Sequence, residues 1–195
     1  MTDTLEKSIL QRFVHAGMSW QQFKLIQEGF ADSPGLRLFY HQGEVEIVTV
    51  SPEHEMISCI LAALLVEYFV EKNIEFTPTG SWTQEKEEEA SVQADKSYCI
   101  GESSTTPDLS IEVVLTSGGP SKLNRYRSLA VPEVWFWEEG LLSLYRLRSE
   151  GYKRINRSEL LPDLDIELLT RCVLMAYTSR VAAIKEFKRA IASQT

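Results

Sequence analysis

The sequence predicts an α/β fold in which helices flank a central mixed β-sheet. Residues 109–115 form a nearly continuous run of apolar and β-branched side chains, which is typical of a central strand covered on both faces. A helical segment and a second apolar strand follow this run, and a strand–helix–strand connection implies a parallel pair of strands. Hairpin patterns before and after this unit add antiparallel neighbours. The sum is a mixed sheet with helices packed against it.

Bulk properties favour an ordinary globular protein. The chain has 195 residues, which fits a single domain over 1–195, and its 44% hydrophobic and 25% charged residues are close to globular averages. The cysteines Cys59, Cys99 and Cys172 show no CxxC spacing, which argues against a structural zinc site. The odd count and the absence of a signal peptide favour a cytoplasmic protein. The most apolar window, residues 57–70, is too short to span a bilayer and contains Glu67, so we expect no membrane partner.

The first third of the chain predicts two helices around a hairpin. Ser19 and Gln22 form a capping-box pattern, which predicts a helix from Ser19 to about Gly29. This helix belongs to residues 1–30, which we expect to flank the sheet. Residues 36–40 and 44–50 alternate as the two strands of a hairpin. Ser51, followed by proline, then begins a helix that continues through Glu71 with one apolar stripe.

The remaining elements are predicted as short strands and two helices. Strands are expected over residues 75–77, 97–100, 109–115, 134–137, 142–147 and 151–155, the last at an edge. The charged run 85–89 predicts a solvated loop. Residues 117–120 break the central strand, and a helix is expected over 121–129. A long C-terminal helix is expected over 169–192 and flanks the sheet as residues 169–193.

The central strand is the first candidate for chemistry. Side chains alternate along a strand, so Asp108, Ser110 and Glu112 share one face. Carboxylates on an apolar strand are costly to bury unless something compensates their charge, and a divalent cation can do so. In the alternative interpretation, Asp108 lies at the exposed mouth of the strand and Glu112 pairs with an arginine.

The charge distribution allows two interpretations. The net charge of −8 argues against tight nucleic-acid binding when taken alone. Residues 1–120 contain 7 Lys and Arg against 19 Asp and Glu, whereas residues 121–195 contain 13 against 9. An acidic half suits metal capture and a basic half could meet phosphates, but two ordinary solvated faces would give the same pattern.

Four segments in order resemble the Uma-two family of endonucleases, a large bacterial group abundant in cyanobacteria. The segments are GEVEIVTVSPEHE (43–55), GSWTQEKEEEASVQADKSYCI (80–100), TPDLSIEVVLTSGGPSKLNRYRSLAVPEVWFWE (106–138) and RSELLPDLDIELL (157–169). The family belongs to the PD-(D/E)XK restriction-endonuclease-like superfamily. The resemblance therefore implies a restriction-endonuclease-like core and a metal-dependent endonuclease acting on nucleic acid, DNA rather than RNA. It also implies Mg²⁺ or Mn²⁺ as cofactor and, by analogy with restriction enzymes, a homodimer.

The resemblance assigns roles to particular residues. Asp95 falls on the superfamily's first aspartate, although Ala94 stands where the family usually has proline. Glu112 falls on the glutamate of the second half-motif, and Val114 stands where a lysine is expected. Lys122, from the following helix, matches the place from which this family supplies the lysine. Asp108 matches a further aspartate that could be a metal ligand or a positioning group.

Three auxiliary residues are predicted with alternatives. Glu46 and His54 match acidic and histidine positions upstream, but a solvent-facing strand residue and a structural histidine are equally compatible with the pattern. Arg125 lies one turn beyond Lys122 and could contact a phosphate, or it could be a surface arginine. Because fold does not fix function, a catalytically inactive binding or regulatory module on a nuclease fold stays as the second hypothesis. The negative charge and the displaced lysine favour it.

Overall fold

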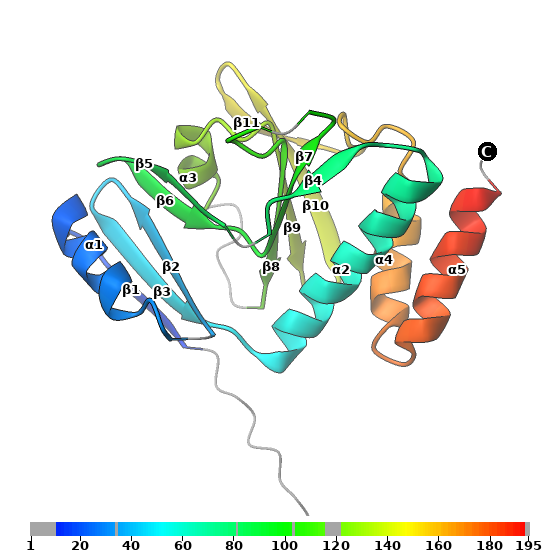
Figure 1. Cartoon of the computed structure of the whole chain (residues 1–195), viewed down its shortest axis with the longest axis horizontal. Coiled ribbons are helices and arrows are strands. Elements are labelled where there is room, and N and C mark those ends of the chain that lie inside the picture. Colours follow the sequence, from blue (N-terminus) through cyan, green and yellow to red (C-terminus); the bar gives the residue numbers. More distant parts are fainter. Residues whose placement is uncertain (1–10, 34, 81, 103, 116–121, 194–195) are drawn as a thin grey trace, which may run out of the picture.

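The computed structural model describes residues 11–33, 35–80, 82–102, 104–115 and 122–193. It is an α/β structure with two β-sheets and helices on their outer faces (Figure 1). The predicted fold class is confirmed, but the strands form two sheets where the sequence predicted one. Among the described residues, none of the helices is long and apolar enough to cross a bilayer.

The larger sheet is mixed, and its centre matches the predicted crossover. Its strand order is β11-β10-β9-β8-β7-β4. Strands β8 (Leu109–Val114) and β9 (Glu133–Glu138) are parallel and are connected through the short helix α3 (Leu123–Ser128). All residues of β8 are buried, as expected for a strand covered on both faces. The antiparallel neighbours are β4 (Phe76–Pro78), β7 (Lys96–Ile100), β10 (Leu141–Arg148) and β11 (Gly151–Ile155).

The smaller sheet is antiparallel and has the order β1-β3-β2-β6-β5. The predicted hairpin is its centre, with β2 (Leu36–His41) paired to β3 (Glu44–Thr49). Three strands of this sheet were not predicted as strands. They are β1 (Arg12–His15), β5 (Thr83–Lys86) and β6 (Ala90–Gln93).

Exposure explains why two of these strands escaped prediction. All residues of the edge strand β1 are exposed, so its segment shows no apolar alternation. The flanking helix expected within residues 1–30 begins at Trp20, directly after the predicted cap Ser19, and residues 12–15 of that range are strand. Strand β5 is the opposite edge and carries charged residues, which protect an edge against pairing with other chains. The run expected to be a loop therefore forms the end of β5 and the turn into β6, where Glu88 has φ 60°.

Helices cover both outer faces (Figure 1). Helix α1 (Trp20–Gly29) begins with the predicted capping box and packs Phe23 against the outer face of the smaller sheet. Helix α2 (Pro52–Glu71), capped by Ser51, covers the larger sheet together with α4 (Ile166–Met175) and α5 (Arg180–Ala192). The single C-terminal helix expected over 169–192 is wrong. The chain turns after Met175, Ser179 caps α5, and both helices pack against α2.

A separate apolar cluster lies in the inner layer between the two sheets. Phe39 and Val92 of the smaller sheet meet Val114 and Phe136 of the larger sheet, with Tyr126 of α3 beside them. The expected break at residues 117–120 and the first residue of the helix expected over 121–129 lie outside the described residues, and α3 itself ends at Ser128. Polar residues that face this inner layer are therefore held between two sheets and away from bulk water.

Candidate active site

Asp95 lies where the chain passes from the smaller sheet to the larger one. Strand β6 ends at Gln93 and β7 begins at Lys96, so Asp95 belongs to the short connection between the sheets. Its Oδ2 accepts a hydrogen bond from the backbone N–H of Val113, at 2.7 Å, and lies 3.0 Å from Nε2 of His54. The carboxylate is 5% exposed. The central strand and the first turn of α2 together fix its position.

Glu112 projects from β8 into the inner layer and is 2% exposed. Its Oε2 accepts a hydrogen bond from Nζ of Lys122, at 3.2 Å, and its Oε1 accepts one from the hydroxyl of Tyr126. Burial raises the pKa of Glu112, and the charge of Asp95 raises it further, whereas Lys122 and Tyr126 act against the shift. The pKa remains above its ordinary value, so the ionised carboxylate lacks full compensation from the protein.

A small pocket of about 30 Å³ joins these side chains. Asp95, Glu112 and Lys122 line it, together with Glu46, His54 and Arg37. This volume accommodates one or two waters or an ion, and it is far too small for a nucleotide. A larger ligand could therefore place only a small group at the pocket, such as one phosphate of a nucleic acid.

Glu46 forms a buried ionic cluster beside the pocket. Its side chain is fully buried on β3, with Arg125 Nη2 at 2.5 Å from Oε2 and Arg12 Nε at 2.6 Å from Oε1. Burial acts to raise the pKa of Glu46, but Arg125 and then Arg12 outweigh it and hold the pKa below its ordinary value. Arg125 is 5% exposed and is therefore not a surface arginine.

Phe39 supports both cations of α3 from the opposite sheet. Nζ of Lys122 lies 5.0 Å from the centroid of its ring, and Cζ of Arg125 lies 5.2 Å from it. Cations over an aromatic face are attracted by its negative electrostatic potential. The ring therefore helps to hold Lys122 where it reaches Glu112. Val114, which stands where the superfamily has its lysine, is part of the apolar layer and supplies no charge.

Asp108 is not brought to this pocket. It precedes β8, and its Oδ2 accepts a hydrogen bond from the backbone N–H of Ile100, at 2.8 Å. The side chain thus holds the start of β8 to the end of β7. This position matches the alternative interpretation, in which Asp108 lies at the mouth of the strand.

Two residues of the site were not singled out in the sequence. Tyr126 lies one helical turn beyond Lys122, and its spacing could have placed both side chains on the same face of α3. Arg37 lies two residues before Phe39 on β2, so strand alternation places both on the inner face. Both signals depend on knowing that a second sheet faces β8, which the sequence did not predict.

The donor set fits a hard divalent cation only in part. Within the described ranges, no group of three or more His, Cys, Asp and Glu side chains is arranged to hold a metal ion. Asp95 and Glu112 nevertheless line one pocket. Burial raises the pKa of Glu112, so its ionised form is disfavoured, and a bound cation would offset that penalty. Mg²⁺ is commonly bound by one or two carboxylates, with water and substrate phosphate as its other ligands. The two carboxylates are compatible with that mode.

Comparisons with known proteins identify the family and the fold. Residues 20–175 match the model of the Uma2 family, described as "putative restriction endonuclease". The fold is similar to the crystal structure of a "putative nuclease belonging to DUF820" from Anabaena variabilis, with a TM-score of 0.52 and 13% sequence identity over 87% of this chain and 99% of that one. No functionally curated protein matches the sequence. At this identity the structural match shows a common fold alone.

Proposed function

Since the chain belongs to the Uma2 family, described as "putative restriction endonuclease", we propose that it is a metal-dependent endonuclease that hydrolyses phosphodiester bonds of DNA. One observation carries the proposal. Asp95 from the connection between the sheets, Glu112 from the central strand and Lys122 at the start of α3 line the same small pocket. Two carboxylates and a lysine are the groups that metal-assisted phosphodiester hydrolysis needs.

The proposed roles follow from the position of each group. Asp95 and Glu112 would hold Mg²⁺ or Mn²⁺, since hard oxygen ligands select such cations. When bound, the ion would lower the pKa of a water and stabilise charge on the phosphoryl oxygens. Lys122 would then contact the phosphate or orient the attacking water. His54 and the N–H of Val113 hold Asp95 at the pocket.

The cellular setting is part of the same proposal. Cutting both strands of a duplex takes two such sites, so we propose that the protein acts on DNA as a homodimer. Cys59, Cys99 and Cys172 are free thiols, which fits a reducing cytoplasm.

Cleavage of a supercoiled plasmid tests the proposal directly. We expect nicking with Mg²⁺ or Mn²⁺ and none with EDTA. Glu112→Gln, Asp95→Asn and Lys122→Met should each abolish it. Glu150→Gln changes an exposed carboxylate on the turn between β10 and β11 and should cut like the wild type. If the wild type leaves the plasmid intact, or if Glu112→Gln cuts equally well, the enzyme claim is wrong.

A second candidate is a catalytically inactive binding module, and one observation favours it. The pocket carboxylates already have partners within the chain, Glu112 in Lys122 and Tyr126, and Asp95 in His54. Calorimetric titration with Mn²⁺ separates the two functions. Binding that is lost in Asp95→Asn supports the enzyme, whereas no metal binding together with retained DNA binding supports the module.

A further inference from the structure

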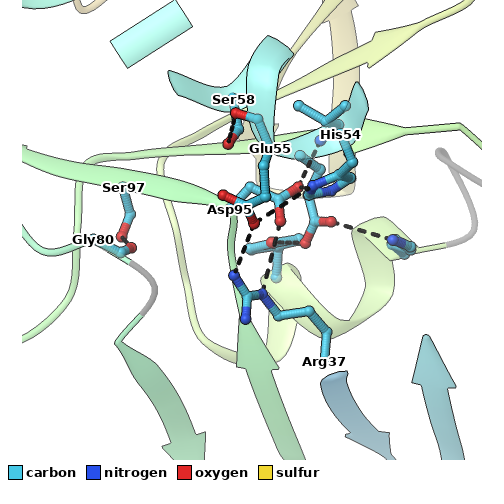
Figure 2. A network of polar contacts seen from close by, with 11 residues as sticks. Arg37, His54, Glu55, Ser58, Gly80, Asp95 and Ser97 are labelled. Carbon is cyan, nitrogen blue, oxygen red and sulfur yellow. Dashed lines mark hydrogen bonds and ion pairs between the residues drawn. The ribbon is translucent and has the colours of Figure 1, made fainter. Parts of the chain in front are cut away.

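Arg37 is the cation of the pocket whose hydrogen-bonding groups are least committed. It lies on β2 of the smaller sheet, and its side chain points across the inner layer toward Asp95 (Figure 2). Nε lies 3.9 Å from Oδ1 of Asp95, and Nη2 lies 3.8 Å from Oε1 of Glu55. Both distances exceed that of a hydrogen bond. Nε is buried without a hydrogen-bond partner.

Nη1 of Arg125 is likewise buried without a hydrogen-bond partner, but each of the other cations around the pocket lies closer to a buried carboxylate than Arg37 does. Lys122 donates to Glu112 at 3.2 Å, and Arg125 and Arg12 lie 2.5 Å and 2.6 Å from oxygens of Glu46. These three compensate the buried carboxylates Glu112 and Glu46, and moving any of them would weaken that compensation. The two neighbours of Arg37 need it less. Asp95 is hydrogen-bonded to Val113 and His54, and the side chain of Glu55 is 49% exposed to water.

A buried N–H group such as Nε of Arg37 is costly to leave without a hydrogen bond, and a ligand could supply one. Because the group is a cationic donor, an anion suits it best, and such a ligand would enter the pocket beside Asp95 and Glu55. An arginine presents its donors as a planar fork that matches two oxygens of a phosphate. The side chain of Arg37 is only 19% exposed, so such a contact would form in a partly desolvated place where it is strong.

We propose that Arg37 is a catalytic residue that contacts the phosphate to be cleaved and neutralises the charge that develops on its oxygens. The inference rests on the proposed nuclease function and adds a group to it. Lys122 approaches the pocket from α3 beside the larger sheet, and Arg37 approaches from the smaller sheet. The two cations would thus hold the phosphate from both sheets, beside the carboxylates Asp95 and Glu112.

Two measurements on the full-length protein test the role of Arg37. The first is cleavage, in which Arg37→Ala should lower kcat/KM about 100-fold, as loss of one donor to developing charge typically does. Arg37→Lys keeps the charge but not the fork, and it should lose roughly tenfold. Arg154→Ala removes an arginine of the edge strand β11, outside the pocket, and should cut like the wild type. Circular dichroism melts check that each variant is folded.

The second measurement separates phosphate contact from mere support of Asp95. In a Glu112→Gln background, binding of a short DNA duplex is measured at several salt concentrations. The plot of log K against log salt has a negative slope, and removing one phosphate contact reduces its magnitude by about 0.9. We expect this decrease with Arg37→Ala and an unchanged slope with Arg37→Lys and with Arg154→Ala.

The combined outcomes keep the two proposals distinguishable. Slower cleavage together with a shallower slope supports the role of Arg37. The role is overturned if a folded Arg37→Ala protein keeps the wild-type kcat/KM, or if adding Arg37→Ala to Glu112→Gln leaves the slope of the Glu112→Gln protein unchanged. If the wild type binds DNA but does not cleave it, the nuclease proposal and the catalytic role fail together, and a shallower slope then leaves Arg37 as a phosphate-binding residue of the module.

Discussion

Replacing Tyr126 by phenylalanine removes one hydroxyl from the protein interior and nothing else. The ring is fully buried in the inner apolar layer, and phenylalanine keeps its packing. The hydroxyl donates to Oε1 of Glu112. Burial, and then the neighbouring charge of Glu112, raise the pKa of Tyr126 well above its ordinary value, so the hydroxyl stays protonated at any pH used here. Glu112 is therefore the partner in this hydrogen bond that titrates.

The expected cost depends on pH because the charge of Glu112 does. The pKa of Glu112 is raised in the folded protein, so its ionised form costs stability as the pH rises through the folded pKa. The Tyr126 hydroxyl reduces that cost. A hydrogen bond to a charged group contributes about 2 kcal/mol and one to a neutral group about 1 kcal/mol. We expect Tyr126→Phe to lose about 1 kcal/mol where Glu112 is neutral and about 2 kcal/mol where it is ionised, so the loss should be larger at pH 9 than at pH 5.

Urea denaturation without metal ions, at both pH values, measures the two losses. Tyr152→Phe is the matched control, because its hydroxyl donates at 2.5 Å to the backbone carbonyl of Val131, which does not titrate. Its loss of about 1 kcal/mol should be the same at both pH values. Equal losses for Tyr126→Phe at pH 5 and pH 9, or a smaller loss at pH 9, would refute the argument that burial leaves the charge of Glu112 undercompensated.

Two further predictions concern stability. Glu46→Gln leaves Arg125 and Arg12 without their buried partner charge, so unfolding in urea at pH 7 should show a loss of about 3 kcal/mol. The pKa of Glu46 is lowered in the folded protein, so its contribution is present above the unfolded pKa of about 4.5 and is lost as the pH falls through the folded pKa. The wild type and the variant should therefore converge in acid, and equal stability at pH 7 would contradict the prediction. Ser19→Ala removes the cap of α1 and should cost about 1 kcal/mol in the same assay, and an unchanged midpoint would show that the cap does not stabilise the fold.

The centre of the larger sheet could be predicted because its strands β8 and β9 are buried. Strand β8 has no exposed residue, and its apolar run is visible without any knowledge of its neighbours. The same holds for Ser19 and Ser51, whose caps are local features of a few residues. The C-terminal helices were merged because residues 176–179 contain no proline or glycine that would end a helix. In the structure Ser179 caps α5, and both helices pack against α2.

The candidate site was predicted in part. Asp95, Glu112 and Lys122 came from the resemblance, and the structure brings all three to one pocket. The cluster around Glu46 and the Phe39 ring beside Lys122 could not be predicted, because they depend on a second sheet whose edge strands β1 and β5 have no apolar pattern. Arg12 on Glu46 is the clearest case, since its strand was not predicted. Asp108 shows the opposite limit, because residues that share a strand face need not share a site.

Because the chain passes between the sheets at Asp95, the pocket can form only at a late stage of folding. The smaller sheet contributes Arg37 and Glu46, the larger sheet contributes Glu112, and Asp95 lies in the connection that joins them. A folding intermediate with only one sheet formed would contain no pocket. Since such long-range pairings form late, the groups that line the pocket would meet only when folding is complete. Under the proposed function, the protein would then be inert toward DNA until both sheets have formed.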